Sequence, residues 1–240
     1  MRINRYLAAC GVCSRRDADR LIEEGRVTVD GHTAKPGDRV EDGVFVLLDG
    51  RRLLPATEHG LYLYYKPRGV VCTDRDAHAK RTLAGELENH PALPKGRRLL
   101  YIGRLDKESE GLLLLTDDSR LKRALESAES GIEKEYLVET DVPLSGEAVQ
   151  RLEKGVYLSD LNLSTRPCRI RRTDDLHFRI TLTEGKNRQI RRMCLTEGVQ
   201  VKRLVRVREG CVLLGSMKPG DLAEADESVR RQLYQEAELS

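Results

Sequence analysis

Between residues 61 and about 223, short strand-like and helical segments alternate, and this mixture limits the possible folds more than any other feature. The segments do not follow the regular strand–helix–strand series of a parallel α/β domain. We therefore expect an α+β domain built around a β-sheet. The clearest segments are strands at 112–115, 136–139, 178–182 and 212–214, and helices at 119–127, 146–154 and 188–197.

The apolar content predicts a globular chain that does not cross a membrane. Apolar residues make up 39% of the 240, and the 20 glycines bring the share close to that of ordinary globular proteins. That share is roughly 45–50%, so a mainly disordered chain is excluded. No stretch approaches the ~18 consecutive apolar residues that a membrane-spanning helix needs.

The cysteine pattern gives no metal site and favours a reducing compartment. Of six cysteines, Cys10 and Cys13 have a metal-like spacing, but no second pair of ligands follows them. Scattered free cysteines are typical of the cytosol, so we expect a cytoplasmic protein. The letters at 7–10 resemble a lipidation box, yet Arg2 and Arg5 lie where its apolar signal core would be.

The first 57 residues are expected to form a module of two short helices and a β-hairpin. Ser14 is the predicted N-cap of the second helix, and Asp30-Gly31 is a strong hairpin signal. The segment 2–50 resembles an S4 RNA-binding domain. A helix–hairpin unit that serves only protein packing remains the alternative. The resemblance implies RNA contacts for Arg15, Arg16, Arg20 and Arg26.

The chain contains many charged residues but has a small net charge, so the positions of the charges along the sequence are more informative than the net charge. The net charge is +3, while 34% of the residues are charged, against a norm of ~25%. Basic residues gather between Lys186 and Arg208, where Glu197 is the only acid. This density favours contact with nucleic acid, and a solvated, salt-bridged surface is the alternative.

A single carboxylate, Asp106, lies in a turn just before a run of four leucines. Arg104 and Lys107 flank it, and glycines at 103 and 111 allow the backbone to turn tightly. A carboxylate near fixed cations stays ionised at neutral pH, which suits a nucleophile better than a proton donor. An acid in such a turn can also be no more than a turn former.

Four motifs in order resolve this ambiguity. The segment 103–116, G-R-L-D-K-E-S-E-G-L-L-L-L-T, resembles the catalytic motif of the S4-bearing ribosomal RNA pseudouridine synthases. Residues 66–69 are similar to the first signature turn of that family, residues 133–138 to its tyrosine-bearing strand, and residues 184–193 to its basic third motif. With the S4-like start, the resemblance spans nearly the whole chain.

Carried over position by position, the resemblance implies that Asp106 is the essential acid, which attacks the target nucleoside or abstracts from its sugar. Tyr136 would stack on the displaced uracil and take part in proton transfer at its ring. Arg191 would pair with Asp106 and hold it ionised, and Ile190 would pack against the base. Further RNA contacts are implied for Arg104, Lys66, Lys186, Arg188 and Arg192.

The resemblance also implies an architecture and a substrate. We expect a mixed, mostly antiparallel sheet with flanking helices and a central basic cleft over residues 61–228, after an S4-like domain at 1–57 and before a polar tail at 229–240. The last stretch, 224–240, is expected to be a polar helix or a frayed tail. The wording of the motifs favours a uridine of 23S ribosomal RNA over one of 16S RNA. The partner would be ribosomal RNA or a pre-ribosomal particle, bound by a monomer without a cofactor.

Two other functions remain as alternatives. A non-catalytic RNA-binding factor for ribosome assembly would have the same fold and bind RNA without turnover. A glycosidase with paired carboxylates would use Asp106 with Glu108 and Glu110, but we expect both glutamates to face water. The five histidines have no ligand spacing, and Cys194 has no histidine partner nearby.

Overall fold

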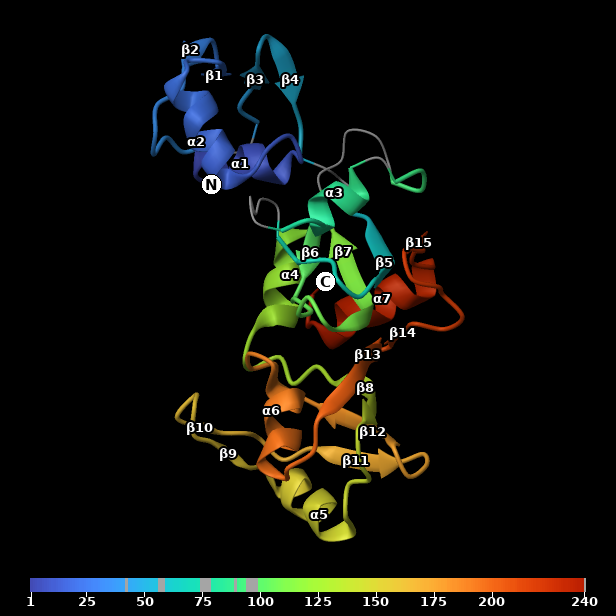
Figure 1. Cartoon of the computed structure of the whole chain (residues 1–240). Coiled ribbons are helices and arrows are strands. Elements are labelled where there is room, and N and C mark those ends of the chain that lie inside the picture. Colours follow the sequence, from blue (N-terminus) through green and yellow to red (C-terminus); the bar gives the residue numbers. More distant parts are fainter. Residues whose placement is uncertain (42, 56–58, 74–78, 89, 94–98, 240) are drawn as a thin grey trace.

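The computed structural model describes residues 1–41, 43–55, 59–73, 79–88, 90–93 and 99–239, and its N-terminal module lies at one end of the molecule (Figure 1). The module contains two helices, α1 (Ile3–Ala9) and α2 (Arg15–Glu23). A four-stranded sheet of order β2-β1-β3-β4 packs against them. Its strands are β1 (Val27–Val29), β2 (His32–Thr33), β3 (Val46–Leu48) and β4 (Arg51–Leu53).

The predicted cap and hairpin of this module are confirmed. The Ser14 hydroxyl oxygen accepts a hydrogen bond from the backbone N–H of Asp17 at 3.0 Å and donates one to the Asp17 carboxylate at 2.6 Å. Asp30 and Gly31 both have positive φ, 46° and 84°, as a type I′ turn requires. These local features explain why the module could be recognised from its sequence.

The rest of the chain is organised by a nine-stranded sheet of order β11-β12-β8-β13-β7-β5-β15, with β14 paired to β13 and β6 paired to β7. As far as the structure describes it, only β13 and β7 run parallel, so the predicted mostly antiparallel sheet is confirmed. Its strands are β5 (Leu61–Lys66), β6 (Leu100–Ile102), β7 (Glu110–Thr116), β8 (Lys134–Thr140), β11 (Arg169–Arg172), β12 (His177–Leu182), β13 (Val201–Glu209), β14 (Val212–Leu213) and β15 (Leu222–Glu224).

Strand β7 contains the four leucines and is buried on both faces of the sheet. Leu112 and Leu114 belong to one hydrophobic cluster, whereas Leu113 and Leu115 belong to another. This alternation follows from the two-residue period of a strand. Burial of each leucine contributes about 1.5–3 kcal/mol to the free energy of folding. The turn that contains Asp106 therefore precedes a firmly packed strand.

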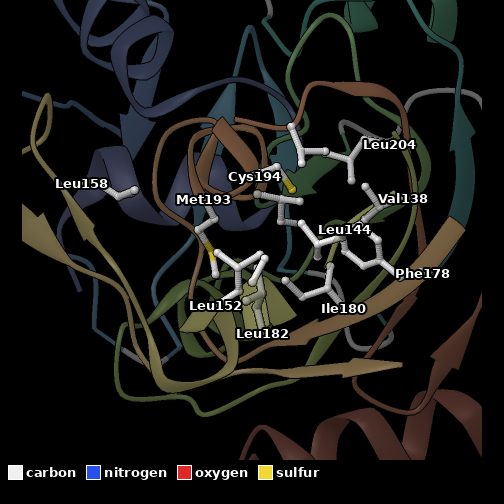
Figure 2. Packing of buried hydrophobic residues seen from close by; sticks show 13 residues of the cluster. Val138, Leu144, Leu152, Leu158, Phe178, Ile180, Leu182, Met193, Cys194 and Leu204 are labelled. Atoms are coloured by element: carbon white, nitrogen blue, oxygen red, sulfur yellow. The ribbon is translucent and has the colours of Figure 1, made fainter. Parts of the chain in front are cut away.

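Helices cover the two halves of the sheet separately. Helices α5 (Gly146–Lys154) and α6 (Gln189–Thr196) pack on β8, β12 and β13, and Figure 2 shows Met193 and Cys194 of α6 among the leucines of this cluster. Helix α4 (Ser119–Glu126) packs on β6 and β7. All three predicted helices are confirmed. The remaining short elements are α3 (Leu83–Leu87), β9 (Tyr157–Leu158) and β10 (Leu163–Ser164).

The C-terminal segment forms helix α7 (Glu227–Glu236), one of the two structures expected there. Its fully buried Leu233 and the partly buried Val229 and Tyr234 pack into the cluster that also contains the buried leucines of α4. Residues 56–58, at the expected boundary between the two domains, lie outside the described residues. Within the described part of the chain, no helix is long and apolar enough to cross a bilayer.

Candidate active site

A cleft of about 800 Å³ lies where several distant segments of the nine-stranded sheet domain meet. It brings together four of the predicted site residues: Asp106 and Arg104 from the turn before β7, Tyr136 from β8, and Lys186 from the loop before α6. Lys107, Lys122, Lys134 and Arg166 add further positive charge to its walls. The predicted basic cleft is therefore present.

The turn that carries Asp106 is held by hydrogen bonds to its backbone. The N–H of Ser109 donates to the Asp106 carbonyl at 3.0 Å, and the N–H of Gly69 donates to the Lys107 carbonyl at 2.7 Å. Among the described residues, the Asp106 carboxylate itself forms no hydrogen bond or ion pair. The turn fixes the position of Asp106, and its carboxylate is not engaged by another described side chain. The carboxylate is therefore suited to react with a bound molecule.

Lys66 supports this turn from below, and the prediction that it contacts RNA is wrong. Its side chain is fully buried and its ammonium group donates to the carbonyls of Ser109 at 2.7 Å and Pro67 at 3.0 Å. Burial lowers the pKa of Lys66 to about 8, against the attraction of Cys72, Asp106 and Glu110. Because its ammonium group is buried and bonded to two backbone carbonyls, Lys66 cannot contact a phosphate of bound RNA.

Arg191 also acts on the turn, although not by the predicted ion pair. Its guanidinium donates to the carbonyl of Glu108 at 3.2 Å and to the carbonyl of Val201 at 2.9 Å. Burial lowers the pKa of Arg191, and the charges of Glu108 and Asp106 oppose this effect. Arg191 therefore lies within electrostatic reach of Asp106, and its hydrogen bonds to backbone carbonyls fix the turn rather than the carboxylate.

Tyr136 forms part of the cleft wall and packs against the clusters on both sides of it. Burial raises the pKa of its phenol, an effect that the positive charge of Arg206 counteracts. The phenol is thus neutral at physiological pH. Ile190, predicted to pack against a base, is 4% exposed and belongs to the core under α6.

The other residues predicted to contact RNA differ in whether they form ion pairs with acidic side chains of the protein. Arg15, Arg16 and Arg104 are exposed and form no ion pair within the described part of the chain. The remaining ones have acidic partners: Arg20 with Asp17 and Glu24, Arg26 with Asp49 and Glu24, Lys186 with Glu184, Arg188 with Glu108, and Arg192 with Asp160.

The basic run that ends at Arg208 is not the uniform nucleic-acid surface that its sequence favoured. Arg203 pairs with Glu110 at 2.7 Å, and Arg208 pairs with Glu133 at 2.9 Å and with Glu135 at 3.1 Å. The acids come from other segments, so the sequence of the run does not reveal them. Glu110, expected to face water, is 7% exposed because Arg203 and the Tyr65 hydroxyl satisfy it.

Sequence reasoning also missed buried charges in the cleft itself. Arg206 was counted with the basic run, but it is 1% exposed and pairs at 3.1 Å with Glu209, which is fully buried. That Arg206 and Glu209 are buried in the cleft follows only from the pairing of β13 with β8, which the sequence alone does not reveal. No group of three or more histidine, cysteine or acidic side chains that could hold a metal occurs among the described residues.

Both parts of the chain are similar to known protein families. The model of the RNA pseudouridylate synthase family matches residues 60–196, and that of the S4 domain matches residues 1–54. The chain is 38% identical over 223 residues to the dual-specificity RNA pseudouridine synthase RluF of Escherichia coli (strain K12), covering 92% of this chain and 74% of the relative. It is 35% identical over 247 residues to ribosomal large subunit pseudouridine synthase B of Yersinia pestis, covering 99% and 76%.

A solved structure has the same architecture along the whole chain. The crystal structure of a pseudouridylate synthase superimposes with a TM-score of 0.70 at 26% sequence identity, covering 97% of this chain and 99% of that one. The similarity therefore includes the N-terminal module and the sheet that carries the cleft.

Proposed function

The chain belongs to the RNA pseudouridylate synthase family, and we propose that it converts a specific uridine of 23S ribosomal RNA to pseudouridine with Asp106 as the essential acid. The observation that carries this proposal is a cleft lined by both the Tyr136 ring and Asp106, whose carboxylate has no hydrogen bond or ion pair among the residues that the structure describes. The names of the relatives, one of which acts on the large ribosomal subunit, support 23S RNA over 16S RNA.

The reaction is an isomerisation, so all atoms of the uridine remain in the product. The bond between N1 of uracil and C1′ of ribose breaks, the base turns, and C5 bonds to C1′. The proton of C5 is lost and N1 gains one. In this proposal Asp106 attacks the nucleoside or abstracts from its sugar, and Tyr136 stacks on the detached uracil and takes part in the proton transfer at C5. Arg191 and Lys66 hold the turn of Asp106 in place.

The target base must first leave its stack, which costs a few kcal/mol. Stacking on an aromatic ring returns about 1–3 kcal/mol, and Tyr136 is suited to this role in a chain with 4% aromatic residues and no tryptophan. Positive charge along the cleft, including Arg104 and Lys186, would hold the phosphates of the extruded nucleotide.

The N-terminal module, for which we propose the bounds 1–57, would anchor the enzyme on folded RNA through Arg15 and Arg16. The catalytic domain would extend over 61–228. The partner would be ribosomal RNA or a pre-ribosomal particle in the cytoplasm, bound by a monomer that needs no cofactor. The carboxylate in the cleft argues against a factor that only binds RNA, because an acid beside a polyanion weakens binding.

The release of tritium from RNA labelled at C5 of uridine tests the proposal. The wild-type protein should release label from 23S transcripts and not from 16S transcripts. Asp106→Asn should reduce the rate by at least about a thousandfold and still bind RNA. Glu108→Gln is the matched control, because Glu108 lies two residues away and its carboxylate pairs with Arg188 at the surface.

Three outcomes contradict parts of this proposal. Equal rates for the wild type and Asp106→Asn would remove Asp106 from its role. Label released only from 16S RNA would replace the substrate. RNA binding without any release of label would favour the assembly factor.

A further inference from the structure

On strand β13, which pairs with the strand of Tyr136, the cleft contains a buried ion pair that the proposed chemistry leaves without a role. Arg206 and Glu209 both line the cleft, and they are 1% and 0% exposed. Nε of Arg206 donates to the carbonyl of Leu112 at 2.6 Å, and the ammonium of Lys134 approaches the other side of Glu209 at 3.8 Å. Three charges are thus enclosed next to one phenol.

A β-bulge brings these groups to the same face of the sheet. Arg206 lies opposite Tyr136 across the β8–β13 pair, and the register shifts between Arg206 and Arg208, so that Glu209 lies opposite Lys134. In a regular strand, residues three apart point to opposite faces. The bulge therefore turns Glu209 into the cleft, and bulges that redirect a side chain are frequent next to active sites.

The position of Arg206 is fixed by close backbone packing. Gly111 has a φ of +104°, and a Cβ atom there would lie 2.4 Å from the carbonyl oxygen and 2.7 Å from the nitrogen of Arg206. The two strands approach each other this closely only because residue 111 has no side chain. Arg206 is therefore held on a rigid backbone beside Tyr136.

Stability does not explain why the ion pair is kept. A buried ion pair is often no better than apolar residues of the same size, because both charges lose their water. Here Nη2 of Arg206 and both carboxylate oxygens of Glu209 lack a well-aligned hydrogen bond within the described part of the chain. The protein keeps an incompletely satisfied pair at the wall of its cleft, which points to a use there.

We propose that Glu209 is a positioning residue that acts through Arg206, holding the Tyr136 phenol protonated and aimed at the base in the cleft. The inference rests on the proposed function, since it concerns the same site. Without Glu209, the positive charge of Arg206 would be free to stabilise a phenolate and to draw the ring away from the base.

The charges around the phenol support this direction. Those that face Tyr136 are Arg206 and Glu209 from β13, Asp106 from the turn before β7, and Lys134 on the same face of β8. Burial raises the pKa of Tyr136, Arg206 lowers it, and Glu209 and Asp106 raise it again. Loss of Glu209 alone leaves the lowering effect of Arg206 with less opposition.

Glu209→Gln tests the proposal with two measurements on the full-length chain. In tritium release, kcat should fall about tenfold while KM changes less than twofold. In 13C NMR of protein labelled at Cζ of tyrosine, the ionised fraction of Tyr136 at pH 10 should rise by about two- to fivefold. Tyr136→Phe identifies the Tyr136 signal among the eight tyrosines.

Glu133→Gln is the matched control, because Glu133 also pairs with arginines, Arg208 and Arg169, but lies outside the cleft. It should change neither measurement. Wild-type values of both kcat and ionised fraction in a folded Glu209→Gln protein would overturn the inference. If the wild type itself releases no label, the proposed function fails, whereas the NMR measurement still tests the link between Glu209 and Tyr136.

A second variant applies if Glu209→Gln does not fold. Arg206→Met with Glu209→Met removes both charges together, which buried pairs tolerate better than the loss of one partner. This double variant should fold, judged by circular dichroism. Burial alone then keeps the Tyr136 phenol protonated, so its ionised fraction at pH 10 should not exceed that of the wild type. Because Arg206 no longer aims the ring, kcat should still fall about tenfold. A folded double variant with wild-type kcat would overturn the proposal.

Discussion

At the scale of single residues, buried charges rather than surface charges shape the cleft. Lys66, Arg206 and Glu209 are each at most 1% exposed, and all three adjoin the turn or the strand that carries a candidate catalytic group. A buried ion changes the pKa of its neighbours far more than a solvated one. The consequences are therefore measurable as pH effects.

The lowered pKa of Lys66 predicts that the free energy of unfolding depends on pH. Its pKa is about 8 in the folded protein and 10.5 when unfolded, so the folded state disfavours the protonated form. Stability contributed by this residue is lowest below pH 8 and rises as pH increases from about 8 to 10.5. Between these limits the free energy of unfolding should increase by about 3 kcal/mol relative to Lys66→Met.

Urea unfolding of both proteins at pH 7.5 and 10 measures this difference. Lys154→Met serves as control, because Lys154 is exposed at the end of α5 and should show no such change. A difference between wild type and Lys66→Met that stays constant with pH would show that Lys66 remains fully charged in the folded protein.

Some site residues could be predicted from the sequence and others could not, for a physical reason. Asp106 and Tyr136 belong to continuous motifs, so local sequence identifies them. Glu209 gains its place only through the bulge and the register of β13 on β8, which no local pattern encodes. Arg191 contacts the turn of Asp106, but its partner there, the backbone carbonyl of Glu108, has no signature in the sequence.

At the scale of secondary structure, the close approach of β7 and β13 is the feature on which the cleft depends. Gly111→Ala should reduce the free energy of unfolding by about 2–5 kcal/mol, because the new methyl group meets backbone atoms that cannot move aside. Gly131→Ala is the control. It also has positive φ, 62°, but lies in open space, so its loss should be only about 1–2 kcal/mol.

Denaturant titration of both variants measures these losses, and tritium release measures the effect on the cleft. If both variants lost the same free energy of unfolding, β7 and β13 would be able to move apart at Arg206 at little cost. The activity of Gly111→Ala should fall with its stability, since Arg206 cannot keep its position opposite Tyr136 once the backbones move apart.

Helices and central strands were predictable because their apolar periodicity is strong. Helix α5 has capping Ser145 before it and buried Ala148 and Leu152 along one face, and β7 has its leucines. For the segment of helix α7, the mostly polar sequence left a polar helix and a frayed tail open. Fully buried Leu233 and the hydrogen bond from the Tyr234 hydroxyl to Asp118 hold the helix. Contacts to distant segments decided its structure, and its own composition did not.

At the scale of the whole molecule, the proposed function divides RNA binding between the N-terminal module and the cleft. Exposed arginines without acidic partners displace counterions from RNA, whereas arginines already paired with acids displace fewer. Replacing Arg15 and Arg16 by glutamine should therefore reduce the slope of log K against log salt by about 1.4–1.8. The activity of the bound complex should not change.

Binding to a 23S transcript across a salt series measures the slope. Arg179→Gln is the control, because Arg179 is engaged with Glu135 at 2.8 Å on the sheet. An unchanged slope for the double variant would mean that the module does not anchor the RNA through these arginines.

The parallel contact between β7 and β13 also determines when the enzyme can become complete during its synthesis. Helix α4, strand β8, helix α5 and the β11–β12 hairpin are all translated between the two partners. Until β13 leaves the ribosome, Glu110 lacks Arg203, and β7 offers an open edge at its Glu110 end. We expect a nascent chain in this state to bind chaperones, because the central apolar strand β7 awaits β13, which is made after its other partners β5 and β6.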